Sequence, residues 1–239
     1  MPTFSAIRKS LLGLVAATPI GYNVATMQPD PTWVADRVAN GTVMIDANMG
    51  EGRVAHGAGF LVYKDDKRMG VIVTNAHIVE GAARLDVTFS NNDKLQAIPL
   101  AVDHDLDLAV LVVTKTPKRA RPLILANSDE LKVGERVIAL GQPFGFTFNT
   151  TGGIVSSPAI KRDISGGATP KFGLDAPVNP GNSGGPVANM QARIEGVATE
   201  IFNPNANPFT MPTSIGLGFA IPANVVRKKV EDTLGMKLG

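Results

Sequence analysis

Short apolar runs rich in β-branched residues, separated by turn residues, are the feature that most constrains how this chain folds. Six runs precede a basic, proline-containing segment at residues 115–122, and six follow it. Many short strands at this spacing are typical of antiparallel barrels. We therefore predict an all-β fold of two six-stranded antiparallel β-barrels. The runs are Thr42–Ile45, Gly57–Tyr63, Val71–Asn75, Arg84–Phe89, Leu95–Val102 and Ala109–Val113, then Val137–Leu140, Thr147–Ser156, Lys171–Asp175, Pro186–Asn189, Arg193–Phe202 and Leu217–Pro222.

These runs divide the chain into an N-terminal arm at residues 1–33 and one domain at residues 34–235. We expect barrel 1 at about residues 40–115 and barrel 2 at about residues 122–222, followed by a helix at residues 223–234. A chain of 239 residues, 44% of them hydrophobic, can fill two barrels and an interface between them.

The last predicted element is an amphipathic helix. Val226, Val230 and Leu234 recur every four residues, and Gly235 provides a stop signal. We expect the apolar side to pack on barrel 2. The basic residues of the helix are expected mainly on its solvent side: Arg227, Lys228 and Lys229.

Catalytic chemistry is indicated by the stretch Asn179-Pro180-Gly181-Asn182-Ser183-Gly184-Gly185-Pro186. We interpret Ser183 as a nucleophile, because the neighbouring glycines leave room for a pocket lined by backbone N–H groups. Such donors stabilise the negative charge that forms on a carbonyl oxygen under attack. A glycine-rich turn closed by proline has the same composition, so the interpretation depends on a base and an acid elsewhere in the chain.

A candidate base and acid are present. His77 follows an apolar run, where the end of a strand can present a side chain to a cleft. Asp107 opens the apolar run 108–113, and a carboxylate there is unfavourable unless it is paired. A neutral imidazole is a natural partner, and Asp105 is the alternative acid. His56 has no evident acid partner, and we expect no ligand role for it.

The chain order of these residues distinguishes between folds. No histidine follows residue 104, which excludes the α/β-hydrolase order, in which the histidine comes after the serine. The subtilisin order begins with an acid before the histidine. None of the aspartates before His77 opens a buried run as Asp107 does: Asp36, Asp46, Asp65 and Asp66. The order His77, Asp107, Ser183 is that of chymotrypsin-like double barrels.

With these segments in view, the chain resembles the HtrA (Deg) branch of the trypsin-like serine proteases. The resemblance covers roughly residues 35–226 and is specific, because it comprises many ordered blocks. It implies that Ser183 is the nucleophile, His77 the base and Asp107 the acid, with the N–H groups of Gly181 and Ser183 as oxyanion donors. The blocks are Gly57–Phe60, Thr74–Gly81, Asp107–Leu111, Val133–Gly145, Gly153–Ser156, Asn179–Pro186 and Gly216–Pro222.

The same resemblance implies a substrate preference. Val178, Ile201 and Leu217 match positions that line the primary specificity pocket, and all three are apolar, which implies cleavage after small or medium aliphatic residues. Three features depart from the family pattern. No PDZ domain is expected before the end at Gly239, the loop between the first two strands is short, and Leu174 stands where a threonine often precedes the aspartate of the activation loop.

Composition limits the cofactors and partners. The net charge of +2 gives no reason to expect nucleic acid or anionic lipid as the main partner. The absence of cysteine excludes disulfides and thiolate chemistry, and the three histidines lack metal-site spacing. We therefore predict no metal and no cofactor, with proteins or peptides as substrates.

The N-terminal segment has two readings. Two basic residues, Arg8 and Lys9, precede an apolar run at residues 11–17, as in a signal peptide, and this favours a periplasmic or secreted protein. The alternative is an arm that is not removed. The run is too short to span a bilayer, and we expect no integral membrane span. The resemblance implies a homotrimer formed through this segment, with Trp33 at the contact; the alternative is that Trp33 packs on its own barrel.

These observations predict a serine endopeptidase that hydrolyses peptide bonds through an acyl-enzyme, with unfolded or damaged proteins as substrates and protein quality control as the role. The alternative is a catalytically idle, chaperone-like binder of unfolded segments, which would use the same apolar cleft. A third reading is an esterase that uses the same residues on small acyl esters.

Overall fold

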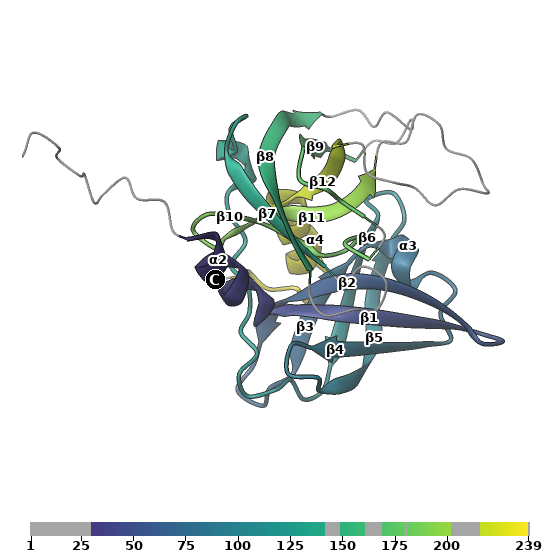
Figure 1. Cartoon of the computed structure of the whole chain (residues 1–239). Helices are drawn as coiled ribbons and strands as arrows, with labels where there is room; N and C mark the ends of the chain where they lie inside the picture. Colours follow the sequence, from purple (N-terminus) through teal and green to yellow (C-terminus); the bar gives the residue numbers. More distant parts are fainter. Residues whose placement is uncertain (1–29, 142–148, 161–168, 180, 202–215, 239) are drawn as a thin grey trace, which may run out of the picture.

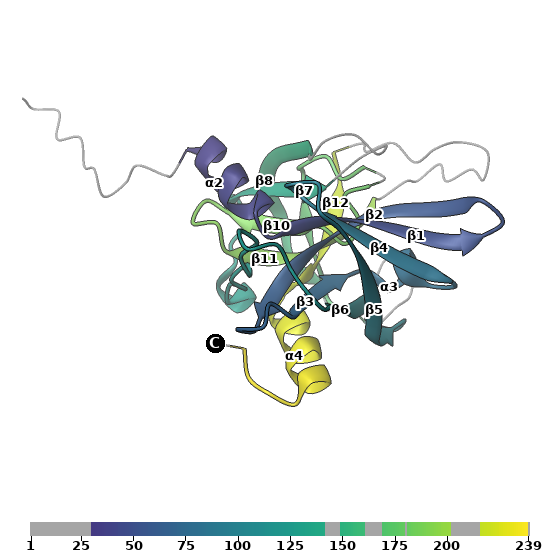
Figure 2. The ribbon, with the colours of Figure 1, turned by 90° about the horizontal axis from the view of Figure 1, so that it is seen from below.

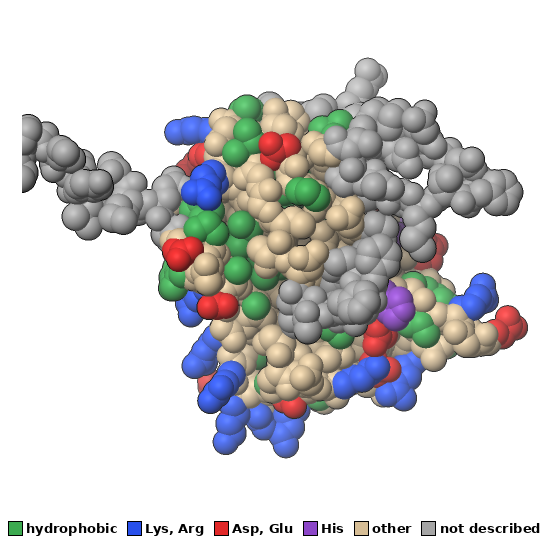
Figure 3. Space-filling view, in the orientation of Figure 1, with side chains coloured by type: hydrophobic (Ala, Val, Ile, Leu, Met, Phe, Trp, Pro, Cys, Tyr) green, Lys and Arg blue, Asp and Glu red, His purple; other side chains and the backbone are tan. Residues whose placement is uncertain are grey.

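The computed structural model describes residues 30–141, 149–160, 169–179, 181–201 and 216–238 (Figure 1). The signal-like segment therefore lies outside the described residues. Within the described part of the chain, no helix is long and apolar enough to cross a membrane. On the face shown in Figure 3, acidic and basic side chains are interspersed.

Two closed antiparallel barrels form the molecule, and the predicted fold class is confirmed. Barrel 1 closes in the order β1-β2-β3-β6-β5-β4, and barrel 2 closes in the order β10-β11-β12-β9-β8-β7. Barrel 1 comprises β1 (Thr42–Gly50), β2 (Arg53–Lys64), β3 (Gly70–Thr74), β4 (Arg84–Phe89), β5 (Lys94–Asp103) and β6 (Leu108–Val113). Barrel 2 comprises β7 (Arg136–Gly141), β8 (Asn149–Ile160), β9 (Lys171–Leu174), β10 (Pro186–Asn189), β11 (Ile194–Ile201) and β12 (Gly218–Pro222).

The first hairpin is longer than the sequence indicated. β1 extends to Gly50 and β2 begins at Arg53, so that only Glu51 and Gly52 form the turn. The outer half of the hairpin carries polar residues, so these parts of β1 and β2 do not appear as apolar runs in the sequence. These residues pair across the hairpin, and His56 lies opposite Asp46, with its Nδ1 2.9 Å from a carboxylate oxygen. The expectation that His56 has no acid partner was therefore wrong.

A hydrophobic core shared by the two barrels fixes how they pack. Leu108 and Val110, on the face of β6 opposite to the core of barrel 1, lie in one cluster with Leu140, Ile194 and Ile221 of barrel 2. All five are fully or almost fully buried. Each barrel also has its own smaller core. The shared core places the loops of both barrels along one seam, where the candidate residues lie.

The C-terminal helix α4 (Ala223–Leu234) lies against both barrels, contacting β11 and β12 on one side and β6 on the other (Figure 2). Val226 and Val230 enter the shared core, and Gly235 ends the helix in a left-handed conformation with φ of 65°. The expectation that the basic residues of α4 lie mainly on its solvent side was wrong for two of the three. Arg227 donates to the carbonyl of Leu125 at 2.7 Å, and Lys229 bonds Asp103 at 2.7 Å, because α4 crosses the seam instead of lying on one barrel.

Shorter helices flank the barrels. In α2 (Pro31–Ala39), Asp30 caps the first turn by accepting from the Thr32 N–H, and Val34 and Val38 are buried. Trp33 is 50% exposed on the same helix. The 3-10 turn η2 (Ser128–Glu130) lies in the link between the barrels, and α3 (Ala76–Val79) follows β3.

Candidate active site

His77 lies on the single turn of α3, just beyond the buried strand β3. The other three residues of this turn are buried and anchor it, while 45% of the His77 side chain is exposed. The preceding Asn75 is fully buried and donates its side-chain N–H to the carbonyl of Asp107 at 2.9 Å. Packing therefore presents one imidazole at the surface, next to the turn that carries the acid.

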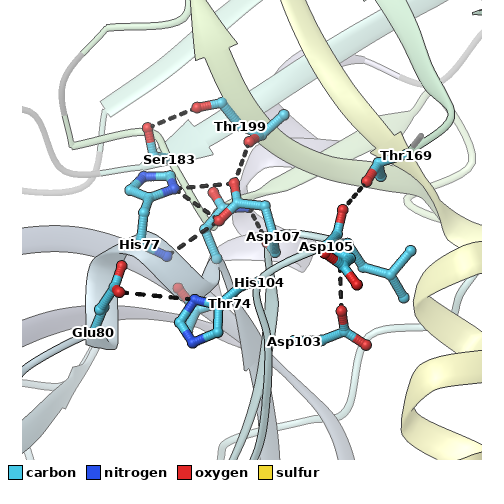
Figure 4. Close-up of polar contacts among 12 residues, drawn as sticks. Thr74, His77, Glu80, Asp103, His104, Asp105, Asp107, Thr169, Ser183 and Thr199 are labelled. Carbon is cyan, nitrogen blue, oxygen red and sulfur yellow. Dashed lines mark hydrogen bonds and ion pairs between the residues drawn. The ribbon is translucent and has the colours of Figure 1, made fainter. Parts of the chain in front are cut away.

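Asp107 is the acid that meets this imidazole (Figure 4). Its carboxylate oxygens lie 2.9 and 3.0 Å from His77 Nδ1, and one of them also accepts the His77 backbone N–H at 3.1 Å. Asp105, the alternative acid, instead contributes its backbone carbonyl, which accepts a hydrogen bond from Thr169. The structure thus brings His77 together with Asp107 and not with Asp105.

The charge of Asp107 is maintained by its neighbours. Burial raises the pKa of this carboxyl, but the hydrogen bond and charge of His77 and the hydroxyl of Thr199 together hold the pKa below its usual value. The group is therefore ionised at neutral pH. An ionised carboxylate keeps the proton of a neutral imidazole on Nδ1, which leaves Nε2 as an acceptor.

Ser183 lies beside the His77 ring in Figure 4, on a turn pressed against barrel 1. Its backbone carbonyl accepts from the Ala58 N–H at 2.9 Å. The next residue, Gly184, has φ of 84°, and a Cβ there would lie 2.2 Å from both Ala58 O and Thr74 Oγ1. Only glycine fits this approach, which explains one glycine of the stretch in terms of barrel packing.

The Ser183 hydroxyl does not bond His77; between these two described residues no hydrogen bond is formed. It donates instead to the backbone carbonyl of Thr199 at 3.2 Å, while the Thr199 hydroxyl donates to Asp107 at 2.7 Å. Thr199 therefore links the serine to the acid. Sequence reasoning missed it, because one threonine in an apolar run cannot be told from any other β-branched strand residue.

The expected oxyanion donors lie on the same turn. Gly181 has φ of 102°, which favours glycine. Within the described part of the chain, no acceptor is found for the backbone N–H of Gly181 or of Ser183. The turn is closed by two backbone bonds of 2.9 Å, from Asn182 to Asn179 O and from Gly185 to Asn182 O.

The three expected specificity residues are only partly described. Val178 is fully buried, and a Cβ on Gly218 would lie 2.6 Å from its Cγ2. Leu217 is partly exposed, and of Ile201 only the backbone is described, paired with Gly218. Residues 202–215 lie outside the description. Among the described residues, no group of three or more His, Cys, Asp or Glu side chains lies in a position to hold a metal ion.

Two closed barrels with a histidine and an aspartate in contact at their seam, and a serine beside them, define the chymotrypsin-like class. A family profile described as "Trypsin-like peptidase domain" matches residues 57–197. The chain belongs to this family.

Individual relatives agree with the HtrA resemblance. The chain is 36% identical over 175 residues to "Protease Do-like 1, chloroplastic" of Arabidopsis thaliana, which covers 71% of this chain and 37% of the relative. It is 37% identical over 186 residues to "Probable periplasmic serine endoprotease DegP-like" of Hahella chejuensis, covering 77% of this chain and 37% of the relative. The chain thus spans about a third of the length of these relatives.

A solved structure titled "HtrA-type protease AlgW with tripeptide" superposes with a TM-score of 0.74 at 25% identity, covering 87% of this chain and 65% of that one. The sequence-based assignment to HtrA-type, trypsin-like proteases is confirmed by these matches.

Proposed function

We propose that this chain is a serine endopeptidase that works through an acyl-enzyme. The observation that carries the proposal is the contact of 2.9 Å between His77 Nδ1 and Asp107 at the seam, with Ser183 beside the ring. Its membership of the trypsin-like peptidase family and its similarity to proteins named as serine endoproteases support it.

The proposed reaction begins when the Ser183 hydroxyl leaves the Thr199 carbonyl and turns to Nε2 of His77. His77 takes the proton as Ser183 attacks the substrate carbonyl, and Asp107 stabilises the resulting imidazolium without itself being protonated. The Gly181 and Ser183 N–H groups stabilise the negative charge on the carbonyl oxygen. His77 then protonates the leaving amine, and water activated by the same imidazole hydrolyses the acyl-enzyme.

Substrate class, location and assembly are further parts of the proposal. Apolar residues at positions 178, 201 and 217 favour a small or medium aliphatic side chain before the cleaved bond, and the substrates are unfolded protein segments. Similarity to relatives named periplasmic supports an extracytoplasmic location. The 50% exposure of Trp33 supports a contact with neighbouring copies in a homotrimer.

Cleavage of an unfolded protein by wild type and by Ser183→Ala tests the proposal. The variant should lose cleavage and keep its fold, because it lacks only one partly exposed hydroxyl. Wild-type turnover in Ser183→Ala would refute the assignment of the nucleophile.

A second candidate is a catalytically idle binder of unfolded segments. One observation favours it: the Ser183 hydroxyl bonds the Thr199 carbonyl and not His77. An idle binder would hold an unfolded protein without cleaving it and would bind equally well as Ser183→Ala. Cleavage by wild type alone excludes this candidate.

A further inference from the structure

The turn that carries Asp107 is held from the other half of the molecule at three alternate residues. Asp103, at the end of β5, bonds Lys229 of α4 at 2.7 Å. The Asp105 carbonyl accepts from Thr169, just before β9, and Asp107 accepts from Thr199 of β11 at 2.7 Å. Figure 4 shows the three aspartates along one loop of barrel 1, with the two threonines opposite.

The turn also has contacts of its own. Asp107 has φ of 51°, in the left-handed region, where Asp and Asn are found more often than other residues that carry a side chain. Its backbone N–H bonds the His104 carbonyl at a long 3.3 Å. Inside the turn, the Asp103 carboxylate also accepts the Leu106 N–H at 3.0 Å. Asp103 therefore joins the turn to α4: one oxygen faces the turn and the other faces Lys229.

The Lys229–Asp103 ion pair is partly shielded from solvent, whereas the Lys228–Asp232 pair within α4 is exposed. Lys229 and Asp103 are 21% and 23% exposed, whereas Lys228 and its partner Asp232 are 77% and 62% exposed. Ion pairs in full solvent contribute little, and partly buried ones are screened less. Lys229 is also the main reason that the pKa of Asp103 lies below its usual value.

The position of Lys229 is fixed by the rest of α4. Val226 and Val230 on either side of it are fully buried in the shared core, and Arg227 bonds the linker carbonyl of Leu125. The helix is thus anchored to both barrels, so that the Lys229 ammonium is presented at one place.

We propose that Lys229 is a positioning residue: through Asp103 it holds the turn that aims the Asp107 carboxylate at His77, so that α4 sets the geometry of the acid. This inference rests on the proposed function for its kinetic consequences. The contacts between α4 and the acid-bearing turn do not depend on it.

The kinetic test compares Lys229→Met with Lys228→Met, which removes the same charge one residue earlier in the same helix. Misplacing a catalytic group by a fraction of an ångström changes rates strongly, so we expect kcat to fall about tenfold in Lys229→Met with KM little changed. Lys228→Met should match wild type, and Lys229→Arg should recover most of the loss. Equal kcat in the two methionine variants would overturn the proposal.

A double-mutant cycle with Asp103→Asn isolates the pair. Asparagine keeps an oxygen for the Leu106 N–H but lacks the charge that holds Lys229. The double variant should be no slower than either single variant, because both remove the same link. If the two losses multiply, Lys229 does not act through Asp103, and the proposal fails.

A spectroscopic test does not depend on turnover. The proton of His77 Nδ1 shared with Asp107 gives a low-field NMR resonance while the two groups are aligned. That resonance should weaken or shift in Lys229→Met and stay unchanged in Lys228→Met, at a temperature where unfolding curves show both variants folded. An unchanged resonance in both contradicts the inference. A wild type that shows the resonance but cleaves nothing contradicts only the proposed function.

Discussion

Asp107 combines a left-handed backbone conformation, a partly buried charge and three donors, and Thr199 is the donor that sequence reasoning did not find. The Thr199 hydroxyl donates to Asp107, and the Thr199 backbone carbonyl accepts from the Ser183 hydroxyl. We expect a residue with both contacts to affect the charge of the proposed acid as well as the starting position of the proposed nucleophile. Its side chain and its backbone therefore have separate effects, and a substitution tests only the side chain.

Thr199→Val keeps the shape of the side chain and removes the donor to Asp107. A hydrogen bond to a charged group contributes about 1.5–3 kcal/mol, so kcat/KM should fall at least tenfold. Thr199→Ser keeps the hydroxyl and should stay near the wild-type value. Steady-state cleavage of one peptide by all three proteins measures this, and a valine variant as active as wild type would show that the contact is dispensable.

The buried carboxyl of Glu195 should make the stability of the protein depend on pH. Burial, together with the nearby charges of Glu135 and Glu130, raises the pKa of this carboxyl despite the hydrogen bond from Asn189. The folded state then holds a proton that the unfolded state releases above about pH 4.5, so stability falls as pH rises through this range.

Glu195→Gln removes this ionisation and keeps an acceptor for Asn189. Its free energy of unfolding should exceed that of wild type at pH 7, and the difference should vanish below pH 4.5, where wild type is protonated in both states. Urea unfolding at both pH values measures the difference. A variant that is less stable at pH 7 would contradict the sign.

At the scale of the structural elements, the turn that carries Ser183 is shaped by its close contact with barrel 1. Gly184 and Gly134 both have positive φ, 84° and 88°, but only at Gly184 would a Cβ meet other atoms, at 2.2 Å. The left-handed conformation alone disfavours alanine at both positions equally. Alanine substitutions at the two glycines therefore distinguish the cost of the left-handed backbone from the cost of close packing.

Gly134→Ala should lower the free energy of unfolding by about 1–2 kcal/mol and leave activity intact, because only the backbone term applies. Gly184→Ala should lose clearly more stability and nearly all cleavage, since the turn must move away from Ala58 and Thr74. Thermal unfolding and peptide cleavage of both variants test this, and equal losses would mean that packing at Gly184 is loose.

Periodicity predicted the elements well because a strand in either barrel has a buried face that appears in its sequence. Chain order singled out His77 and Asp107, which the structure brings into contact, and the assignment of Ser183 as their partner stays a prediction. The missed side-chain contacts depend on pairings between segments that are apart in the sequence. His56 meets Asp46 only through strand register, and Lys229 meets Asp103 only because α4 crosses the seam.

At the scale of the whole molecule, the shared core joins the two barrels, and we expect them to unfold as one cooperative unit. Side chains from β6, β7, β11 and β12 lie in a single buried cluster with α4. Loss of packing in barrel 2 should therefore also lower the local stability of barrel 1. The candidate site, whose residues come from both barrels, depends on that cooperation.

Leu140→Ala tests this cooperation, because Leu140 is fully buried in the shared core. A truncation of this kind lowers the free energy of unfolding by about 2–5 kcal/mol. Hydrogen exchange should then accelerate at slow amides of β6 in barrel 1 as well as in barrel 2. Acceleration confined to barrel 2 would show that the barrels unfold independently.

The central claim is that Ser183 is a nucleophile activated by His77, and labelling with a fluorophosphonate followed by mass mapping of the adduct tests it most directly. The account predicts a single adduct on Ser183 in wild type, slow or absent labelling in His77→Gln, and none in Ser183→Ala. An adduct on another residue, or equal labelling of Ser183 without His77, would contradict it.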